Sequence, residues 1–210
     1  MAILFDLTHA LHRAVLANQD QVKQYPQFAS HVLLQMIKKN ANTFGFSKMN
    51  PMILCQDRSS WRKKAYVEGS KNFIEYKGQT YKGDRKKDDT IPWSEIYQHY
   101  EAAMKALDEH SDMVVMGIEE AEADDVIAIA CKHFSQTEKC FVISSDKDFV
   151  QLQAHNVFIF DPIQDDFRPK VDPIRYKTIH IMCAGDDNIK AIKPRTGKKT
   201  AEKMLPELDM

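Results

Sequence analysis

Four short, unbroken apolar segments of this sequence lead into an aspartate. The segments are 2–5, 51–55, 141–143 and 157–160, and they precede Asp6, Asp57, Asp146 and Asp161. Runs of this length are typical of strands buried on both faces of a parallel sheet, and residues 113–116 form a fifth. Amphipathic helical patterns separate them, over 9–20, 27–44, 93–110 and 121–134. The alternation predicts an α/β fold with a central, mostly parallel sheet and helices on both faces.

The length and composition indicate one folded domain, with room for a small appendage. The chain has 210 residues, of which 43% are hydrophobic, and this is enough to bury a core. No apolar stretch approaches the roughly 18 residues of a membrane span, and the N-terminus lacks a signal-peptide pattern. The four cysteines show no paired spacing, which argues against a zinc site or a disulfide framework. We expect a cytoplasmic monomer with no membrane partner.

The formal net charge of −1 conceals a separation of charge along the chain. Residues 58–89 contain ten basic and five acidic groups, and residues 190–203 contain six basic groups and one acid. Each stretch therefore has a local charge of +5, whereas five carboxylates lie within 119–125. Because binding follows the local field, the two basic stretches favour a polyanionic partner. A single charged run is also compatible with an ordinary solvated helix face.

Aspartates that follow parallel strands meet at one edge of the sheet, where the active sites of open α/β folds lie. The acidic turn 119–125 is predicted to open a helix at the same edge. Crowded carboxylates repel one another, and a divalent cation relieves that repulsion. Carboxylate ligands favour Mg²⁺ or Mn²⁺ over zinc, and two such ions suit phosphodiester hydrolysis. For a single aspartate the alternative is a turn or a helix N-cap, but this alternative weakens for the whole set.

Two pairs of acids have an informative spacing. Glu122 and Asp125 are three residues apart, which places them on one helix face and turns Asp124 away from it. The alternative is that these acids only follow the preference of carboxylates for the positive end of a helix dipole. Asp146 and Asp148 are two residues apart after a strand, so an extended backbone would direct both side chains to the same side.

Several motifs resemble those of the flap endonuclease, or structure-specific 5′-nuclease, family, and in particular its phage ribonuclease H group. They are Phe5–Ala14, Glu122–Asp125 and Ser144–Leu152, with further matches at Cys55–Asp57, Trp61–Lys63 and Tyr81–Arg85. The matches follow the family order from residue 2 to about residue 205. The resemblance implies a PIN-like 5′-nuclease fold. It implies a nuclease domain over 1–180, with a helical arch at 58–90, and a partial DNA-binding region over 181–210.

The resemblance also assigns metal ligands and catalytic residues. It implies one metal site formed by Asp6, Asp57, Glu122, Asp124 and Asp146, and a second formed by Asp125, Asp148 and Asp187. Both would bind Mg²⁺, with Mn²⁺ as a substitute. Lys82 and Arg85 of the arch join the first set as catalytic residues, because cations beside the cleaved phosphate neutralise transition-state charge.

The implied nucleic-acid contacts lie in the arch, in the first helix and near the C-terminus. They are Arg13, Arg62, Lys63, Tyr81, Lys82 and Arg85, and then Gly197, Lys198, Lys199 and Thr200. Tyr81 either anchors the loop or stacks on a base. Residues 197–200 resemble the turn of a helix–three-turn–helix, which holds a potassium ion and binds duplex phosphates without sequence preference.

The resemblance near the C-terminus is incomplete. Asp186 and Asp187 are adjacent, where the family has two residues between its aspartates, and the segment before Gly197 is short. The later helices of the family have no counterpart before Met210. We expect either a truncated duplex-binding region or a chain that omits residues.

The sequence therefore predicts an Mg²⁺-dependent 5′→3′ exonuclease and flap endonuclease with ribonuclease H activity, acting in RNA primer removal during DNA replication. Its substrates would be DNA with 5′ flaps or ends and RNA–DNA hybrids. A single-strand-binding protein and a sliding clamp are partners implied by the resemblance alone, and a phage-encoded copy would act in the host cytoplasm. The alternatives are a catalytically inactive module that binds branched DNA and a PIN-type two-metal nuclease. A haloacid-dehalogenase-like phosphatase is disfavoured because Asp6-Leu7-Thr8 lacks the second aspartate of its D-x-D motif.

Overall fold

The computed structural model describes residues 1–62, 65, 88–153, 156–183 and 196–204. Within these residues the chain divides into two units. The first unit contains residues 1–61, 88–149 and 156–168 and is built on a sheet. The second contains the other described residues, and its main elements are two helices.

The sheet of the first unit has six strands in the order β3-β2-β1-β4-β5-β6. The strands are β1 (Ala2–Asp6), β2 (Met52–Cys55), β3 (Val114–Met116), β4 (Cys140–Ile143), β5 (Val157–Asp161) and β6 (Asp166–Phe167). All neighbours are parallel except β5 and β6. The prediction of a mostly parallel sheet is confirmed, and each of the five predicted strands lies within one residue of its observed bounds. The short antiparallel β6 was not predicted.

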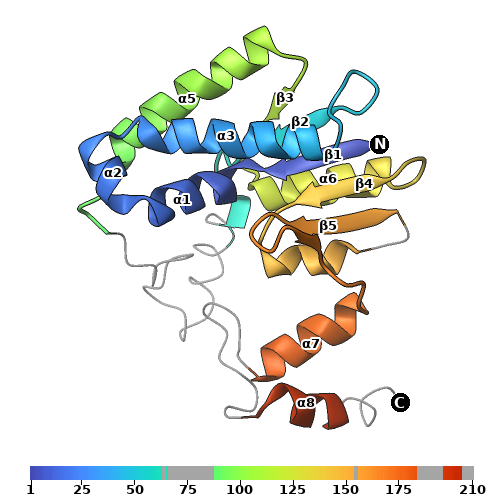
Figure 1. Cartoon of the computed structure of the whole chain (residues 1–210). Helices are drawn as coiled ribbons and strands as arrows, with labels where there is room; N and C mark the ends of the chain where they lie inside the picture. Colours follow the sequence, from blue (N-terminus) through green and yellow to red (C-terminus); the bar gives the residue numbers. More distant parts are fainter. Residues whose placement is uncertain (63–64, 66–87, 154–155, 184–195, 205–210) are drawn as a thin grey trace. The chain divides into compact units, whose positions relative to one another are not determined.

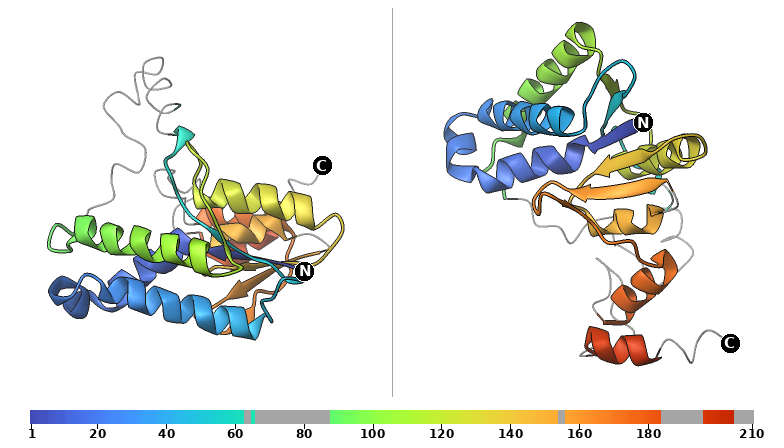
Figure 2. Two further views of the ribbon diagram at one scale, coloured as in Figure 1. Left: turned by 90° about the horizontal axis from the view of Figure 1, so that it is seen from above. Right: turned by 45° about the vertical axis from the view of Figure 1, so that its right-hand side comes forward.

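Helices cover both faces of this sheet (Figures 1 and 2). On one face lie α1 (Leu7–Ala17), α3 (Phe28–Thr43) and α5 (Trp93–His110), and on the other lies α6 (Ala123–Phe134), which packs against β1, β2 and β4. The predicted helix 9–20 is divided into α1 and α2 (Gln19–Gln24). The division lies at Asn18, whose backbone leaves the helical region and whose side-chain amide donates to the carbonyl of Ala14 at 2.8 Å.

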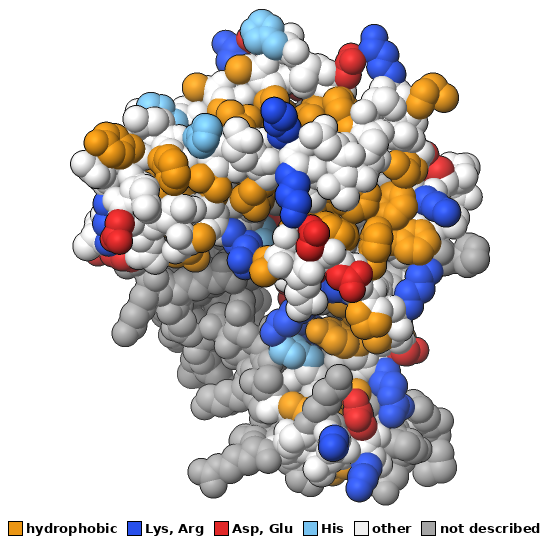
Figure 3. All heavy atoms as spheres, viewed as in Figure 1, with side chains coloured by type: hydrophobic (Ala, Val, Ile, Leu, Met, Phe, Trp, Pro, Cys, Tyr) orange, Lys and Arg blue, Asp and Glu red, His pale blue; other side chains and the backbone are white. Residues whose placement is uncertain are grey.

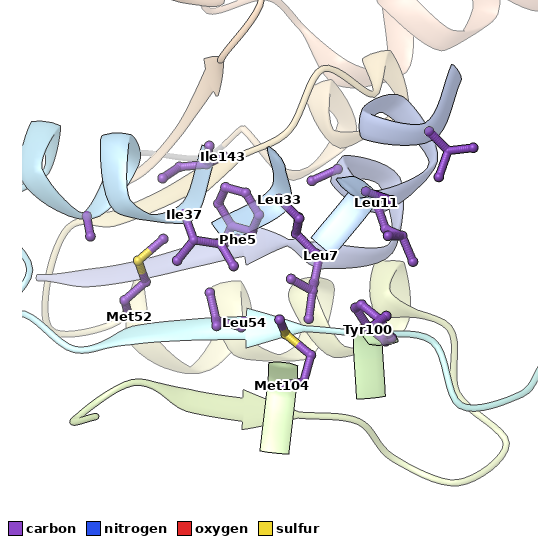
Figure 4. Close-up of a cluster of buried hydrophobic side chains, with 14 of the residues drawn as sticks. Phe5, Leu7, Leu11, Leu33, Ile37, Met52, Leu54, Tyr100, Met104 and Ile143 are labelled. Carbon is purple, nitrogen blue, oxygen red and sulfur yellow. The ribbon is translucent and has the colours of Figure 1, made fainter. Parts of the chain in front are cut away.

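The larger hydrophobic core lies between the sheet and the α1–α3–α5 layer (Figure 4). Ile3 and Phe5 of β1 point into it, and they meet Leu33 and Ile37 of α3. Leu4, between them in the strand, is equally buried on the other face. A strand that is apolar on both faces belongs at the centre of a covered parallel sheet, and β1 occupies that place.

The carboxyl ends of the central strands lie level with one another. Asp6 is in register with Cys55, and Phe5 is in register with Ile143, which in turn is in register with Phe160. The segments that begin at residues 56, 144 and 161 therefore leave the sheet at the same edge as Asp6. We call this the carboxyl edge.

The second unit contains α7 (Pro173–Cys183) and α8 (Lys198–Met204), which pack through Ile179, Met182 and Ala201. The Asp172 carboxylate accepts the backbone N–H of Arg175 at 2.6 Å, and Pro173 occupies the first helical position, so α7 has a well-formed start. None of the described helices is long and apolar enough to cross a membrane.

Candidate metal centre at the carboxyl edge

Asp6 ends β1 and at the same time caps α1. One of its oxygens accepts the backbone N–H of His9 at 3.2 Å, and the other accepts the hydroxyl of Ser144 at 2.7 Å. The side chain is buried, and burial raises the pKa of Asp6 to about 7, although both hydrogen bonds lower it. Repulsion from Asp146 and Asp57 raises it further.

Asp146 lies in the loop after β4, and its neighbours along the chain hold it by short hydrogen bonds. Its backbone N–H donates to the Ser144 hydroxyl at 3.0 Å, and its carboxylate accepts the N–H of Asp148 at 2.8 Å. The chain turns here into a 3-10 helix, η2 (Lys147–Leu152). The expectation of an extended backbone from Asp146 to Asp148 is therefore wrong, because the Asp146 carboxylate caps η2 and so bends the chain.

Asp57 follows β2 and joins three elements of the carboxyl edge. Its backbone N–H donates to the hydroxyl of Thr8 on α1 at 2.8 Å, and its carboxylate accepts the N–H of Ala123, the first residue of α6, at 2.7 Å. The backbone bonds from Arg58 to Ala121 and from Trp61 to Glu120 extend this connection. Asp57 thus has a position fixed by α1 and α6, while its side chain stays exposed.

The acids at the start of α6 have two different roles. Glu122 and Asp125 form a reciprocal capping box, in which each side chain accepts the backbone N–H of the other residue. The Asp124 carboxylate is instead repelled by the other acids of the carboxyl edge. Loss of hydration raises its pKa to about 7, together with repulsion from Asp6, Asp146, Asp57 and Glu122. Part of the Asp124 side chain nevertheless stays exposed.

The observed directions of these side chains therefore differ from those that the residue spacing predicts. The shared face of Glu122 and Asp125 serves the helix cap, as the helix-terminus alternative anticipated, whereas the carboxylate that spacing turned away is the one crowded by the other acids.

The carboxyl edge has the chemistry of a site for a hard divalent ion. Its crowded groups, Asp6, Asp57, Asp124 and Asp146, offer only oxygen, and their mutual repulsion would be relieved by a cation. Among the described residues, no three acidic, histidine or cysteine side chains already surround a point that could hold an ion.

A second group of residues lies at this edge, of which sequence reasoning identified the strand-end Asp161 but missed Arg168. Asp161, which ends β5, forms an ion pair with Arg168 at 2.9 Å, and Arg168 also donates to the carbonyl of Ser145 at 2.6 Å. The hydroxyl of Ser145 is 2.7 Å from Nε2 of His9. Burial lowers the pKa of His9, although nearby Asp146 raises it. The two serines directly before Asp146 indicate hydrogen-bonding groups beside that acid. No sequence pattern indicates a role for Arg168, because it follows a strand of only two residues.

The residues predicted to contact nucleic acid are placed only in part. Arg13 is half-buried on α1, and Arg62 is half-buried in a short helical turn of the second unit. Gly197, Lys199 and Thr200 are exposed at the start of α8, where the Gly197 carbonyl accepts the N–H of Thr200, and Lys198 is the first residue of that helix. Five predicted residues lie outside the described part of the chain: Lys63, Tyr81, Lys82, Arg85 and Asp187.

Most residues of the two basic stretches, 58–89 and 190–203, also lie outside the described part of the chain. The positive local charge expected of these stretches therefore stays a prediction. On the face drawn in Figure 3, acidic and basic side chains of the described residues are interspersed.

The family model of the 5′–3′ exonuclease N-terminal resolvase-like domain matches residues 1–180. This chain belongs to the 5′–3′ exonuclease family, a family of nucleases. Ribonuclease H of Enterobacteria phage T4 is 29% identical over 202 residues, which are 89% of this chain and 61% of that protein. A 5′–3′ exonuclease of Aquifex aeolicus is 36% identical over 95 residues, which are 40% of this chain and 32% of that protein. This chain thus spans less than two thirds of the length of either relative.

Two solved structures have the same fold. The T5 5′-exonuclease with bound zinc has a TM-score of 0.67 at 17% identity, over 99% of this chain and 75% of that one. A T5 flap endonuclease in a complex with DNA and metal ions has a TM-score of 0.65 at 15% identity, over 98% of this chain and 74% of that one. The expected PIN-like 5′-nuclease fold is confirmed.

Proposed function

We propose that this chain is an Mg²⁺-dependent 5′-nuclease that hydrolyses phosphodiester bonds. The observation that carries the proposal is the gathering of Asp6, Asp57, Asp124 and Asp146 at the carboxyl edge, where burial, together with their mutual repulsion, raises the pKa values of Asp6 and Asp124 to about 7. Carboxylates gathered in this way are stable as anions when a cation shares the site. Membership of the 5′–3′ exonuclease family supports the same chemistry.

The proposed ligands fall into two sets. Asp6, Asp57, Glu122, Asp124 and Asp146 would hold one ion, and Asp125, Asp148 and Asp187 would hold the second. When bound, the ions supply positive charge at the scissile phosphate and make a nearby water more acidic. Mn²⁺ would substitute for Mg²⁺, since both prefer oxygen ligands.

The hydrogen-bond donors around these acids have a separate task. The Ser144 hydroxyl and the His9 N–H hold both oxygens of Asp6, and the Ala123 N–H holds one oxygen of Asp57. Each donor orients a carboxylate before an ion arrives, and this lowers the entropy that binding must overcome.

The proposed substrates are DNA with 5′ flaps or ends and RNA–DNA hybrids, as in the removal of RNA primers. Lys82 and Arg85 would neutralise charge on the cleaved strand, and Arg13, Arg62, Lys63 and Tyr81 would hold it. Residues 197–200, with a potassium ion, would contact the duplex backbone. A T4 relative called ribonuclease H and a T5 flap endonuclease in complex with DNA support these substrates. A single-strand-binding protein and a sliding clamp remain proposed partners.

A cleavage assay with two variants tests the proposal. A 5′-labelled flap DNA and an RNA–DNA hybrid are incubated with Mg²⁺, Mn²⁺ or EDTA. We expect products from the 5′ side only with metal, loss of cleavage in Asp146→Asn, and unchanged cleavage in Asp112→Asn. Asp112 is a matched control because it is exposed and precedes β3, so it lies at the opposite edge of the parallel sheet.

Three outcomes would contradict the proposal. Metal-dependent cleavage that survives in Asp146→Asn would place the reaction elsewhere. Salt-sensitive binding of branched DNA without turnover would favour the non-catalytic module. Cleavage that ignores the 5′ end would indicate a PIN-type nuclease of another specificity.

A further inference from the structure

Arg168 connects the turn after β5 with the loop that carries Asp146. Its Nη2 donates to the carbonyl of Ser145 at 2.6 Å and to the carboxylate of Asp161 at 2.9 Å. Its backbone N–H donates to the carbonyl of Ile159 at 2.8 Å, so the residue is also fixed to β5. The Arg168 side chain is 19% exposed and that of Asp161 only 4%. Such a short, sheltered charge-assisted bond has a defined geometry.

Asp161 is placed to orient Arg168. One of its oxygens accepts the backbone N–H groups of Ile163 and Gln164, which forms the turn toward β6, and the other faces Arg168. The desolvation of a buried ion pair offsets much of its Coulomb energy, so the pair contributes little net stability. What it supplies is a fixed direction for the guanidinium.

Ser145 lies between Ser144, whose hydroxyl contacts Asp6, and Asp146, which is one of the crowded acids. The hydroxyl of Ser144 donates to Asp6 and accepts the N–H of Asp146, and the Asp146 carboxylate turns toward η2. On the far side, the hydroxyl of Ser145 contacts His9. Arg168 therefore holds the carbonyl of the peptide unit that joins Ser145 to Asp146.

We propose that Arg168, oriented by Asp161, is a positioning residue of the metal centre, which holds the Ser145 carbonyl and thereby sets the direction of the Asp146 carboxylate. The inference rests on the proposed function, because it concerns the same carboxylates. Outer residues that orient metal ligands typically change metal affinity or activity about 10–100-fold when they are replaced.

Metal binding in the absence of nucleic acid provides a readout that is independent of turnover. Mn²⁺ affinity is measured by electron paramagnetic resonance, well below the melting temperature of each variant, and kcat and KM are then measured on a 5′ flap. We expect Arg168→Met to weaken Mn²⁺ binding about 10–100-fold and to lower kcat at fixed metal concentration, with KM for DNA unchanged. Excess Mn²⁺ should restore part of kcat.

The matched control is Lys39→Met, which removes the 2.7 Å ion pair between Lys39 and Asp165 in the same β5–β6 turn. This pair is exposed and does not contact the Ser145 loop, so Mn²⁺ affinity and kcat should stay at the wild-type level.

Two more variants separate positioning from folding. Arg168→Lys keeps the charge but loses the fixed plane of the guanidinium that directs both Nη2 hydrogens, so we expect a smaller loss of Mn²⁺ affinity than in Arg168→Met. Asp161→Asn keeps an acceptor for the turn and loses the ion pair. Because Asp161 acts through Arg168, adding Asp161→Asn to Arg168→Met should cause no further loss.

The outcomes distinguish this proposal from the proposed function. Wild-type Mn²⁺ affinity in Arg168→Met overturns the positioning role, whatever its melting temperature, and if that variant does not fold, wild-type affinity in Arg168→Lys overturns it. Weakened Mn²⁺ binding in the variants together with a wild-type protein that cleaves nothing would support the positioning role and overturn the nuclease.

Discussion

Asp6 and Asp57 follow neighbouring strands of one sheet, yet their carboxylates have different surroundings. Asp6 is 3% exposed, and both of its oxygens accept hydrogen bonds from within the fold. Asp57 is exposed, and one of its oxygens accepts the first N–H of α6. Burial raises the pKa of Asp6 to about 7.

The difference shows how one site combines a fixed part with an adaptable part. The fixed part is Asp6 with the Ser144–Asp146 loop, and Asp6 is oriented by the Ser144 hydroxyl, directly after β4, and by the His9 N–H of α1. The adaptable part is Asp57 with Asp124, two exposed side chains beside the first turn of α6. We expect the fixed part to dominate metal binding, since its ligands lose less freedom when an ion enters.

The largest effect is expected from Asp6→Asn. The amide keeps an acceptor oxygen but loses the charge, so metal-dependent cleavage should fall by more than about a thousandfold, as expected for several kcal/mol of lost charge stabilisation. Because the raised pKa means that ionised Asp6 opposes folding, the metal-free variant should melt at a higher temperature than wild type at pH 8. Cleavage rates and calorimetry measure the two effects, and a lower melting temperature would contradict the assigned electrostatics.

Asp57→Asn should reduce cleavage less, by about a hundredfold, because an exposed carboxylate is more easily replaced by water in the coordination shell. The amide oxygen still accepts the Ala123 N–H, so thermal stability should stay near wild type. Asp57→Ala removes that acceptor as well and should lower stability by about 1 kcal/mol, as for other lost caps. If Asp57→Asn and Asp6→Asn were equally damaging, the distinction between fixed and adaptable parts would not hold.

The pH dependence of metal binding follows from the raised pKa values of Asp6 and Asp124. Both groups keep a proton below about pH 7 in the folded protein, so Mn²⁺ affinity should fall about 10- to 100-fold between pH 8 and pH 6. Asp124→Asn should make this dependence shallower. Isothermal titration calorimetry across the range measures it.

The same groups determine how stability changes with pH without metal. Between about pH 4 and pH 7 the unfolded chain releases protons that the folded chain retains, so their contribution to stability is lost as the pH rises. Thermal unfolding in EDTA at several pH values checks the sign. A metal-free protein that gains stability through this window would contradict the raised pKa values of Asp6 and Asp124.

A smaller effect is expected from Gly117→Ala at the end of β3. A Cβ there would lie 2.9 Å from Cγ of Gln56 and 2.8 Å from Nε of Arg58, whose guanidinium reaches Glu101. Relief of this contact should displace the segment that leads into Asp57 and cost about 1–3 kcal/mol of stability. Cleavage should fall severalfold, with Mn²⁺ affinity as the second measurement. An unchanged rate would mean that Asp57 does not depend on this packing.

Much of the fold was predictable because its strands carry an unambiguous pattern. Segments such as 2–5 and 157–160 are apolar at every position, which only a sheet covered on both faces accommodates. Two residues of β6 contain no comparable pattern, and its pairing with β5 depends on the turn that Asp161 organises. The break at Asn18 depends on one side-chain bond to Ala14, and periodicity does not register such a bond.

The candidate site was predictable in composition but not in geometry. Strand-end aspartates identify the edge, because parallel topology brings them together. The directions of Glu122, Asp125 and Asp146 depend on helix caps, which compete for the same carboxylates that a metal would bind. The link from Arg168 to Ser145 joins residues far apart in the sequence and is visible only once the strands are paired.

The central place of β1 has a consequence for how the protein is made. β1 pairs with β2 on one side and with β4 on the other, at Ala2–Cys140 and neighbouring positions. During synthesis β1 must therefore wait, half-paired, until β4 has also been made, on the order of ten seconds later at typical translation rates. During that interval one edge of an apolar strand has no partner, so co-translational folding of this chain should be more exposed to aggregation than refolding of the complete protein.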